Sequence, residues 1–322
     1  MTEMNHGYKT DHAFRGNLLG GANEPTFSGA LSFMRRRYSR DLRGVDAVVW
    51  GVPFDCATSN RPGARFGAQA IRRASAIFDG DPQYPSGRDP FEDMAVVDWG
   101  DCAINHARLD LVPGAIETEA RTIIASGAHL ITLGGDHFIT LPLLRAHVAK
   151  HGPLAMVQFD AHQDTWPDDG GALSHGNFVV RAVKEGLIDT AHSIQIGIRT
   201  VAPETCGIEI IDGYSAHEMG VKGMVEAVKR RVGGTPAYLT VDIDVLDPAF
   251  APGTGTPVSG GLSSAQLLMT INGIAGLDWR GMDVVEVAPA YDHADITAIA
   301  ASTVAQHHLQ GLAEKRRKLT LK

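Results

Sequence analysis

Acidic and histidine residues that could hold metal ions occur in three short clusters. The segment DAHQD at 160–164 places three potential ligands at alternate positions, DID at 242–244 repeats the alternation, and His137 follows two glycines. Carboxylates gathered this closely without a cation would raise each other's pKa values. We therefore interpret the clusters as ligands of two divalent ions. The six predicted ligands are His137, Asp160, His162, Asp164, Asp242 and Asp244.

The chemistry that such a centre would support is hydrolysis. Two ions bridged by carboxylates are the arrangement of two-metal hydrolases, in which metal-bound water has its pKa lowered to about 7. An oxygen-rich set with two imidazoles and no thiolate favours Mn²⁺, with Fe²⁺, Co²⁺ or catalytic Zn²⁺ as alternatives. Each short motif alone also fits a loop or a helix cap, and His137 alone fits a hydrogen-bonded core histidine. The coincidence of the three clusters favours the metal centre.

Short apolar runs precede these clusters, and we interpret them as buried strands. The runs are 46–51, 94–98, 129–133, 154–159, 193–198, 208–211, 237–241 and 281–287. Helical patterns lie between them, for example at 114–126, 139–150, 177–186, 223–232, 263–275 and 295–314. This alternation predicts a parallel sheet with helices on both faces. Ligands bind at the carboxyl ends of such strands, so the three clusters, and Glu286 in the last run, should meet at one edge.

The bulk properties narrow the class of protein. The chain has 322 residues, 44% hydrophobic and 20% charged, as is normal for a soluble globular protein. With no linker or repeat, we expect a single catalytic domain at 45–322 after an irregular N-terminal arm at 1–44. A net charge of −8 and a pI of about 5.9 argue against nucleic acid or anionic membrane as partners. Three dispersed cysteines and the absence of a signal peptide or membrane-spanning run favour the cytoplasm.

A family resemblance rests on several longer motifs. They are GVPFD at 51–55, RPGARFGAQAIR at 61–72, GGDH at 134–137, DAHQD at 160–164, SHGN at 174–177, DIDVLDPAFAPGTGTPVSGG at 242–261 and DVVEVAPAYD at 283–292. Together they resemble the ureohydrolase family, which includes arginase and agmatinase. Their residues are most similar to those of agmatinases. The resemblance covers most of the chain.

The resemblance implies a three-layer α/β/α fold with an eight-stranded, mostly parallel sheet and two Mn²⁺ per subunit. It also implies a homo-oligomer built from trimers, either a trimer or a hexamer. Carried over by position, His137 and Asp164 would bind one ion and His162 and Asp244 the other. Asp160 and Asp242 would bridge both ions.

The same resemblance gives catalytic roles to three residues. Glu286 would anchor the substrate guanidinium through charge-assisted hydrogen bonds, although a salt bridge to an arginine at the edge of the core is the alternative. His175 would exchange protons with solvent, as suits an imidazole, although it could also cap the helix that follows. Asp164 would pass a proton to the departing amine.

The distal end of the substrate should meet the loop after DAHQD. Asp168 or Asp169 could receive a distal ammonium and Trp166 could cover a methylene chain, whereas a solvated acidic turn is the plainer interpretation of the two aspartates. We expect Asn177 to border the same pocket and to bind the substrate there. Agmatinases typically have Thr at the position of Gln163, and often have Asp and Thr at those of Ser174 and Asn177.

These features predict an amidinohydrolase for a small cationic guanidino substrate. The expected reaction is the hydrolysis of agmatine to putrescine and urea. This reaction would place the protein in polyamine biosynthesis. The alternative substrates are other guanidino compounds, guanidinobutyrate or guanidinopropionate. A non-catalytic relative is the remaining alternative, but loss of site residues is its usual sign, and all six ligands and Glu286 are present.

Overall fold

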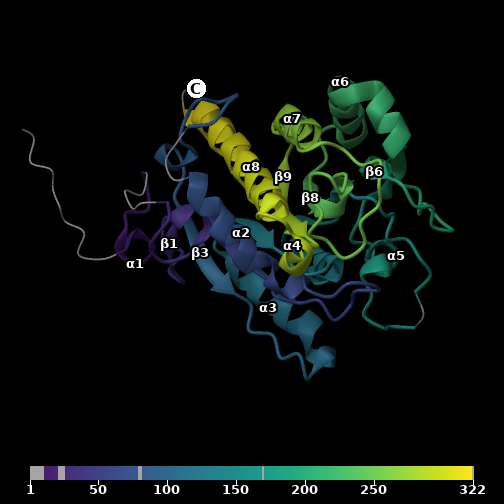
Figure 1. The fold of residues 1–322 in the computed structure, drawn as a ribbon, viewed down its shortest axis with the longest axis horizontal. Helices are drawn as coiled ribbons and strands as arrows, with labels where there is room; N and C mark the ends of the chain where they lie inside the picture. Colours follow the sequence, from purple (N-terminus) through teal and green to yellow (C-terminus); the bar gives the residue numbers. More distant parts are fainter. Residues whose placement is uncertain (1–10, 21–25, 79–81, 169, 321–322) are drawn as a thin grey trace, which may run out of the picture.

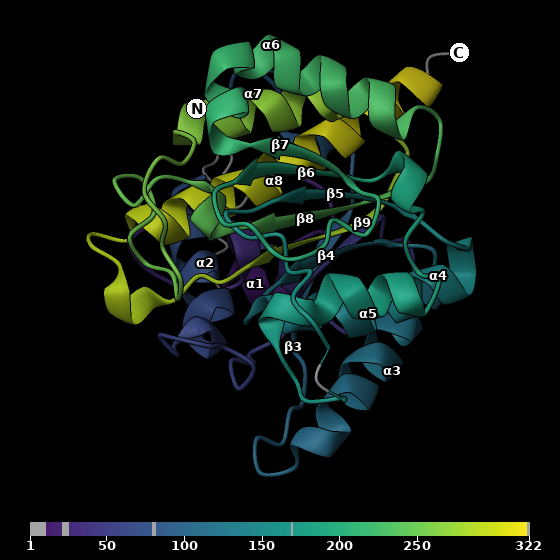
Figure 2. The same ribbon diagram turned by 90° about the vertical axis from the view of Figure 1, so that its right-hand side faces the viewer.

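A parallel sheet of nine strands forms the centre of the computed structural model, with helices on both faces (Figures 1 and 2). The structure describes residues 11–20, 26–78, 82–168 and 170–320. The strands are β1 (Arg37–Tyr38), β2 (Ala47–Gly51), β3 (Val96–Asp101), β4 (His129–Leu133), β5 (Ala155–Phe159), β6 (Ile194–Ile198), β7 (Glu209–Asp212), β8 (Ala237–Asp242) and β9 (Trp279–Val285). Their order in the sheet is β1-β3-β2-β4-β9-β8-β5-β6-β7, and all the strand pairs are parallel.

The three-layer α/β/α fold and the parallel sheet are confirmed, but the predicted number of eight strands was wrong. Each of the eight apolar runs forms a strand, and β1 is the ninth. It has two residues, Arg37 and Tyr38, which pair with Val97 and Asp98 of β3. Neither residue carries an apolar pattern, because the strand is defined by its pairing with β3. The division into an arm at 1–44 and a domain at 45–322 stays a prediction.

Two groups of helices cover the sheet, as Figure 2 shows. One face carries α2 (Gly67–Ser75), α6 (Gly213–Val232), α7 (Ser264–Ile274) and α8 (Ile296–Thr320). The other carries α3 (Val112–Ala125), α4 (Thr140–His151) and α5 (Phe178–Lys184). A short helix, α1 (His12–Arg15), contacts β1. A hydrophobic cluster fills the space on each side of the sheet, which explains why the strands are apolar on both faces.

The middle of the sheet positions the predicted site. β4, β9, β8 and β5 are neighbours in that order, and each is followed or ended by a predicted site residue. Because parallel strands place their carboxyl ends at the same edge, side chains far apart in the sequence converge there. In the part of the chain that the structure describes, no helix is both long enough and apolar enough to cross a bilayer.

Candidate metal centre and active site

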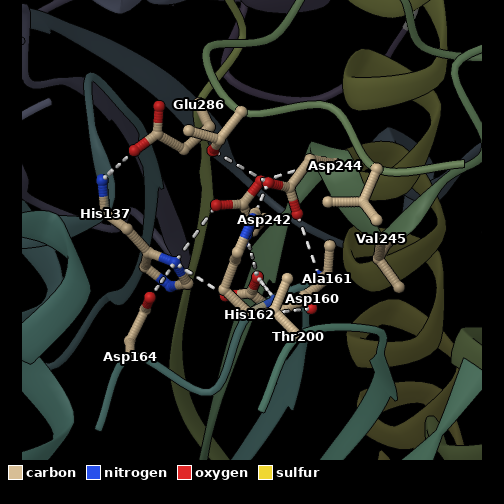
Figure 3. A network of polar contacts seen from close by, with 12 residues as sticks. His137, Asp160, Ala161, His162, Asp164, Thr200, Asp242, Asp244, Val245 and Glu286 are labelled. Carbon is tan, nitrogen blue, oxygen red and sulfur yellow. Dashed lines mark hydrogen bonds and ion pairs between the residues drawn. The ribbon is translucent and has the colours of Figure 1, made fainter. Parts of the chain in front are cut away.

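The first group of predicted ligands surrounds the imidazole of His137. His137 is the first residue of a short 3-10 helix (His137–Ile139), which begins four residues after the end of β4 at Leu133. Its Nδ1 lies 3.0 Å from Asp160 Oδ2, 3.0 Å from Asp164 Oδ2 and 3.2 Å from Asp242 Oδ2 (Figure 3). The ring nitrogen therefore faces carboxylates delivered by β5 and β8. His137, Asp160 and Asp242 offer ligand atoms close enough together to hold one ion.

The second group surrounds His162. Its Nδ1 lies 3.0 Å from Asp244 Oδ2 and 3.5 Å from Asp160 Oδ1, and these three residues could hold a second ion. Asp160 thus turns one oxygen toward each group, which fits the predicted bridging role. Asp242 approaches the His137 group, and its role as a second bridge stays a prediction.

Hydrogen bonds fix the carboxylates of this cluster. Asp160 Oδ1 accepts from the backbone N–H of His162 (2.6 Å), and its Oδ2 accepts from Gln158 Nε2 (2.7 Å). Asp242 Oδ1 accepts from the backbone N–H of Asp244 (2.8 Å). Asp164 has a φ of 52°, a left-handed conformation that is uncommon for residues other than glycine and that clusters at functional sites.

The electrostatics of the cluster fit a divalent metal pair. Burial raises the pKa of Asp242 well above its usual range, and the charges of Asp244 and Asp160 raise it further. Burial and the charge of Asp160 also raise the pKa of Asp164 to about 6. Burial lowers the pKa of His137, but its three carboxylate neighbours outweigh that effect and raise it. Cations relieve this crowding, so the donor set suits metal ions of the predicted kind.

Glu286 and His175 form a pair beside the cluster. Glu286 follows β9 directly, is 0% exposed and has a φ of 65°. Its Oε1 accepts from the backbone N–H of His137 (2.8 Å; Figure 3) and lies 2.9 Å from His175 Nδ1, whereas its buried Oε2 has no hydrogen-bond partner. Its ion-pair partner among the described residues is His175. Burial lowers the pKa of His175, but the charge of Glu286 outweighs this and raises it to about 9.

Ser59 holds the other side of the His175 ring. Its backbone N–H donates to His175 Nε2 at 3.0 Å, and its Oγ lies 2.8 Å from the same nitrogen. Ser59 could not be predicted from the sequence, because nothing in its local pattern marks it. The loop that carries it is brought to His175 only by the fold.

A cavity of about 290 Å³ opens over the cluster. It is lined by Ser59, His162, Asp164, Trp166, Ser174, His175, Gly176, Asp242 and Thr256. Trp166 is therefore placed where the sequence predicted it, at the wall of the cavity. Glu286 does not line it but lies behind His175.

The other predicted tail-pocket residues are placed differently. Asp168 does not line the cavity; it lies 3.1 Å from Arg181 Nη2 and 3.7 Å from Lys184 Nζ, so α5 supplies its partners. Asn177 is buried and is also not among the lining residues. Asp169 lies outside the described residues. The roles of these three residues in substrate binding stay predictions. To bind a substrate ammonium group, Asp168 would have to break its ion pairs with Arg181 and Lys184.

Gln163 faces away from the cavity, although its neighbours His162 and Asp164 are predicted ligands. Its Oε1 accepts from the backbone N–H of Ala202 (2.7 Å), and its Nε2 donates to the carbonyl of Glu204 (3.3 Å). This departure from the usual agmatinase pattern therefore supports a neighbouring loop. Ser174, in contrast, lines the cavity directly.

Comparisons with known proteins agree with this fold. The Arginase family model matches residues 45–310. An agmatinase of Chromobacterium violaceum is 53% identical over 294 residues, which cover 90% of this chain and 91% of the relative. A crystal structure of a hypothetical agmatinase from Burkholderia thailandensis superimposes with a TM-score of 0.93 and 52% identity, covering 95% of this chain and 98% of that one. Proclavaminate amidino hydrolase from Streptomyces clavuligerus has a TM-score of 0.86 and 38% identity, over 90% and 99% of the two chains.

The chain belongs to the arginase family, which confirms the predicted family resemblance. Within it, the chain is an agmatinase-like amidinohydrolase, as its similarity to agmatinases over nine-tenths of its length indicates. The family is metal-dependent, in keeping with the two ligand groups that share Asp160.

Proposed function

We propose that the protein hydrolyses agmatine to putrescine and urea at a centre of two Mn²⁺ ions. The observation that carries the proposal is the convergence of two ligand groups on Asp160, beside a cavity lined by His162, Asp164 and Asp242, in a chain 53% identical to an agmatinase. The six residues that would hold the ions are His137, Asp160, His162, Asp164, Asp242 and Asp244. When bound, such a centre supplies Lewis acidity that lowers the pKa of water to about 7.

In this proposal Glu286 orients the guanidinium group. Its Oε1 is already engaged by His137 and His175, so the unpartnered Oε2 is the atom available for a guanidinium N–H. A carboxylate and a guanidinium form strong charge-assisted hydrogen bonds. Since Glu286 lies behind the cavity wall, the guanidinium would occupy the deepest part of the site, and the alkyl tail would extend past Trp166.

Hydrolysis requires both protons of the attacking water to leave its oxygen, one moving to the leaving nitrogen and the other to solvent. Water adds its oxygen to the guanidinium carbon, the bond from that carbon to the alkyl nitrogen breaks, and the electron pair stays on the nitrogen. Asp164 lines the cavity beside the predicted ions, where its carboxylate is placed to pass a proton to the leaving amine. His175 connects Glu286 at Nδ1 with Ser59 at Nε2 and lines the cavity, so it can exchange protons with solvent.

A second candidate function is hydrolysis of another guanidino compound, such as guanidinobutyrate or guanidinopropionate. It is favoured by the wall around Trp166, Ser174 and Thr256, whose side chains are uncharged. Asp168, the described acidic residue expected to receive an ammonium group, is paired with Arg181 and Lys184 instead.

Urea release from a substrate panel separates the two functions. Protein loaded with Mn²⁺ is incubated with agmatine, arginine, guanidinobutyrate and guanidinopropionate, and urea is measured. Agmatine should give the highest kcat/KM. Urea release from a guanidino acid but not from agmatine would show that agmatine is not the substrate, and it would leave the proposed metal centre unaffected. No urea from any guanidino compound would overturn both.

A further inference from the structure

A buried chain of hydrogen bonds runs from the core of the sheet to His137. It begins at Asp283 of β9, whose side chain is 0% exposed. Asp283 Oδ1 accepts from Thr240 Oγ1 at 2.6 Å, and its Oδ2 accepts from Tyr238 Oη at 2.8 Å and Thr140 Oγ1 at 2.9 Å. Thr240 Oγ1 in turn lies 2.8 Å from His137 Nε2. The carboxylate is thus linked to a predicted metal ligand through a single hydroxyl group.

The direction of these bonds determines which nitrogen of His137 carries the proton. A threonine hydroxyl has one hydrogen, and Thr240 donates it to Asp283. Toward His137 its oxygen can only accept, so Nε2 must carry a hydrogen. A neutral ring then has its lone pair on Nδ1, which is the atom 3.0 Å from the oxygens of Asp160 and Asp164. Metals bind the unprotonated nitrogen of a neutral imidazole.

We propose that Asp283, acting through Thr240, is a positioning residue that holds His137 in the tautomer whose Nδ1 binds metal. The inference rests on the proposed function, because it requires an ion at His137. A metal-binding histidine commonly donates its other ring N–H to a group that fixes its orientation and increases its basicity. Here that acceptor is a hydroxyl whose own proton is directed away by the carboxylate.

The surroundings of Asp283 favour this role over a packing role. Asp283 lies between Met282 and Val284 in β9, whose residues other than Arg280 and Asp283 are apolar and buried. Among the described residues it forms no salt bridge to a lysine or arginine, and a buried carboxylate without one is costly unless it is well hydrogen-bonded. Burial raises the pKa of Asp283, although the charge of His137 and its three hydroxyl partners oppose the shift.

The direct test is the affinity of the metal-free protein for Mn²⁺, measured by titration with detection of free Mn²⁺ by electron paramagnetic resonance. Thr240→Val removes the acceptor of the His137 proton and keeps the shape of the side chain. We expect Mn²⁺ binding to weaken roughly 10- to 100-fold, the effect usual for such supporting groups. Thr240→Ser retains the hydroxyl and should restore the wild-type affinity.

Tyr238→Phe is the matched control. Like Thr240, Tyr238 is fully buried and donates to Asp283, but none of its hydrogen bonds in the described structure reaches His137. It should bind Mn²⁺ within about threefold of wild type, since the link to the metal ligand is intact. Asp283→Asn is the second test variant: an amide N–H turned toward Thr240 would reverse the chain, and Mn²⁺ should bind more weakly.

The outcomes separate this inference from the proposed function. If the wild-type protein does not bind Mn²⁺, the metal centre of the proposed function is wrong. If the wild type binds but folded Thr240→Val binds equally well, the positioning role alone is overturned. Equal weakening by Tyr238→Phe would also overturn it, because the effect would then be one of core packing. Far-UV circular dichroism establishes whether each variant folds. If Thr240→Val does not fold, the Mn²⁺ affinity of Asp283→Asn is compared with that of Tyr238→Phe. Equal affinities would then overturn the positioning role.

Discussion

Two histidines at opposite ends of α4 have the same burial and opposite electrostatics. His137, just before the helix, and His147, near its end, are each 1% exposed. Burial lowers the pKa of both, but the carboxylates of Asp160, Asp164 and Asp242 raise that of His137 well above its ordinary value. Among the described residues no carboxylate offsets the effect of burial on His147, whose pKa stays well below the ordinary value. Burial alone therefore does not set the charge of a histidine in this protein.

The difference extends to the two edges of the sheet. His147 packs against the ring of Tyr238, and neither of its ring nitrogens has a hydrogen-bond partner among the described residues. Nearby, His129 Nε2 and His308 Nε2 lie 2.9 Å apart, so the two rings share one proton between them. The amino edge thus holds a cluster of neutral histidines, whereas the carboxyl edge concentrates charged side chains.

The same substitution at the two histidines should have very different results. His137→Leu removes a predicted metal ligand and the basic group that faces three carboxylates. We expect kcat/KM for urea release to fall by roughly 1,000-fold or more, because a catalytic metal contributes several kcal/mol. Urea assay and Mn²⁺ titration on folded protein check this. Activity within tenfold of wild type would show that the carboxyl edge does not depend on His137.

Glu286→Gln tests charge at the carboxyl edge without removing a metal ligand. The amide keeps the shape but forms weaker hydrogen bonds to a guanidinium, by about 1.5–3 kcal/mol, which corresponds to a fall in kcat/KM of roughly 10- to 100-fold. Mn²⁺ affinity, measured in parallel, should change little. A variant that loses Mn²⁺ while retaining its substrate preference would instead place Glu286 in support of the metal centre.

Ser59→Ala tests a histidine of the carboxyl edge that is held by a hydroxyl as well as by a carboxylate. One hydrogen bond to His175 is lost, at a cost of about 1 kcal/mol, so kcat should fall about fivefold with little change in KM. Ser59→Thr retains the hydroxyl and should recover most of the rate. An equal loss in the Thr variant would argue that Ser59 acts through loop packing.

His147→Leu should have the smallest effect and the opposite sign. It replaces an imidazole without hydrogen bonds by an apolar side chain, so activity should persist and the free energy of unfolding should rise by about 1 kcal/mol. The gain should grow below about pH 6.5, the ordinary histidine pKa. There the unfolded wild-type chain binds a proton that folded His147 does not, so acid destabilises the wild type. Urea unfolding followed by circular dichroism at several pH values checks this, and a gain independent of pH would contradict the explanation.

The sequence predicted the elements with regular patterns and the residues that follow them. All eight apolar runs became strands, and the four segments that carry the ligands and Glu286 meet because their strands are neighbours. Features created by tertiary contact were not predictable. β1 has no apolar pattern, and the pairing of Asp168 with Arg181 depends on where α5 lies. Asp283 did carry a signal, an acidic residue inside an apolar run, whereas Thr240 carried none.

The shortness of β1 has a consequence for how copies of the molecule can meet. The two edge strands of the sheet, β1 and β7, span only two and four residues. Long exposed edges act as templates on which another chain can add a strand, and natural proteins avoid this with short or charged edges. At the other edge, Glu209 of β7 forms a salt bridge with Arg230. The sheet therefore offers little backbone for continuation, and association with further copies would depend on side chains of helices and loops.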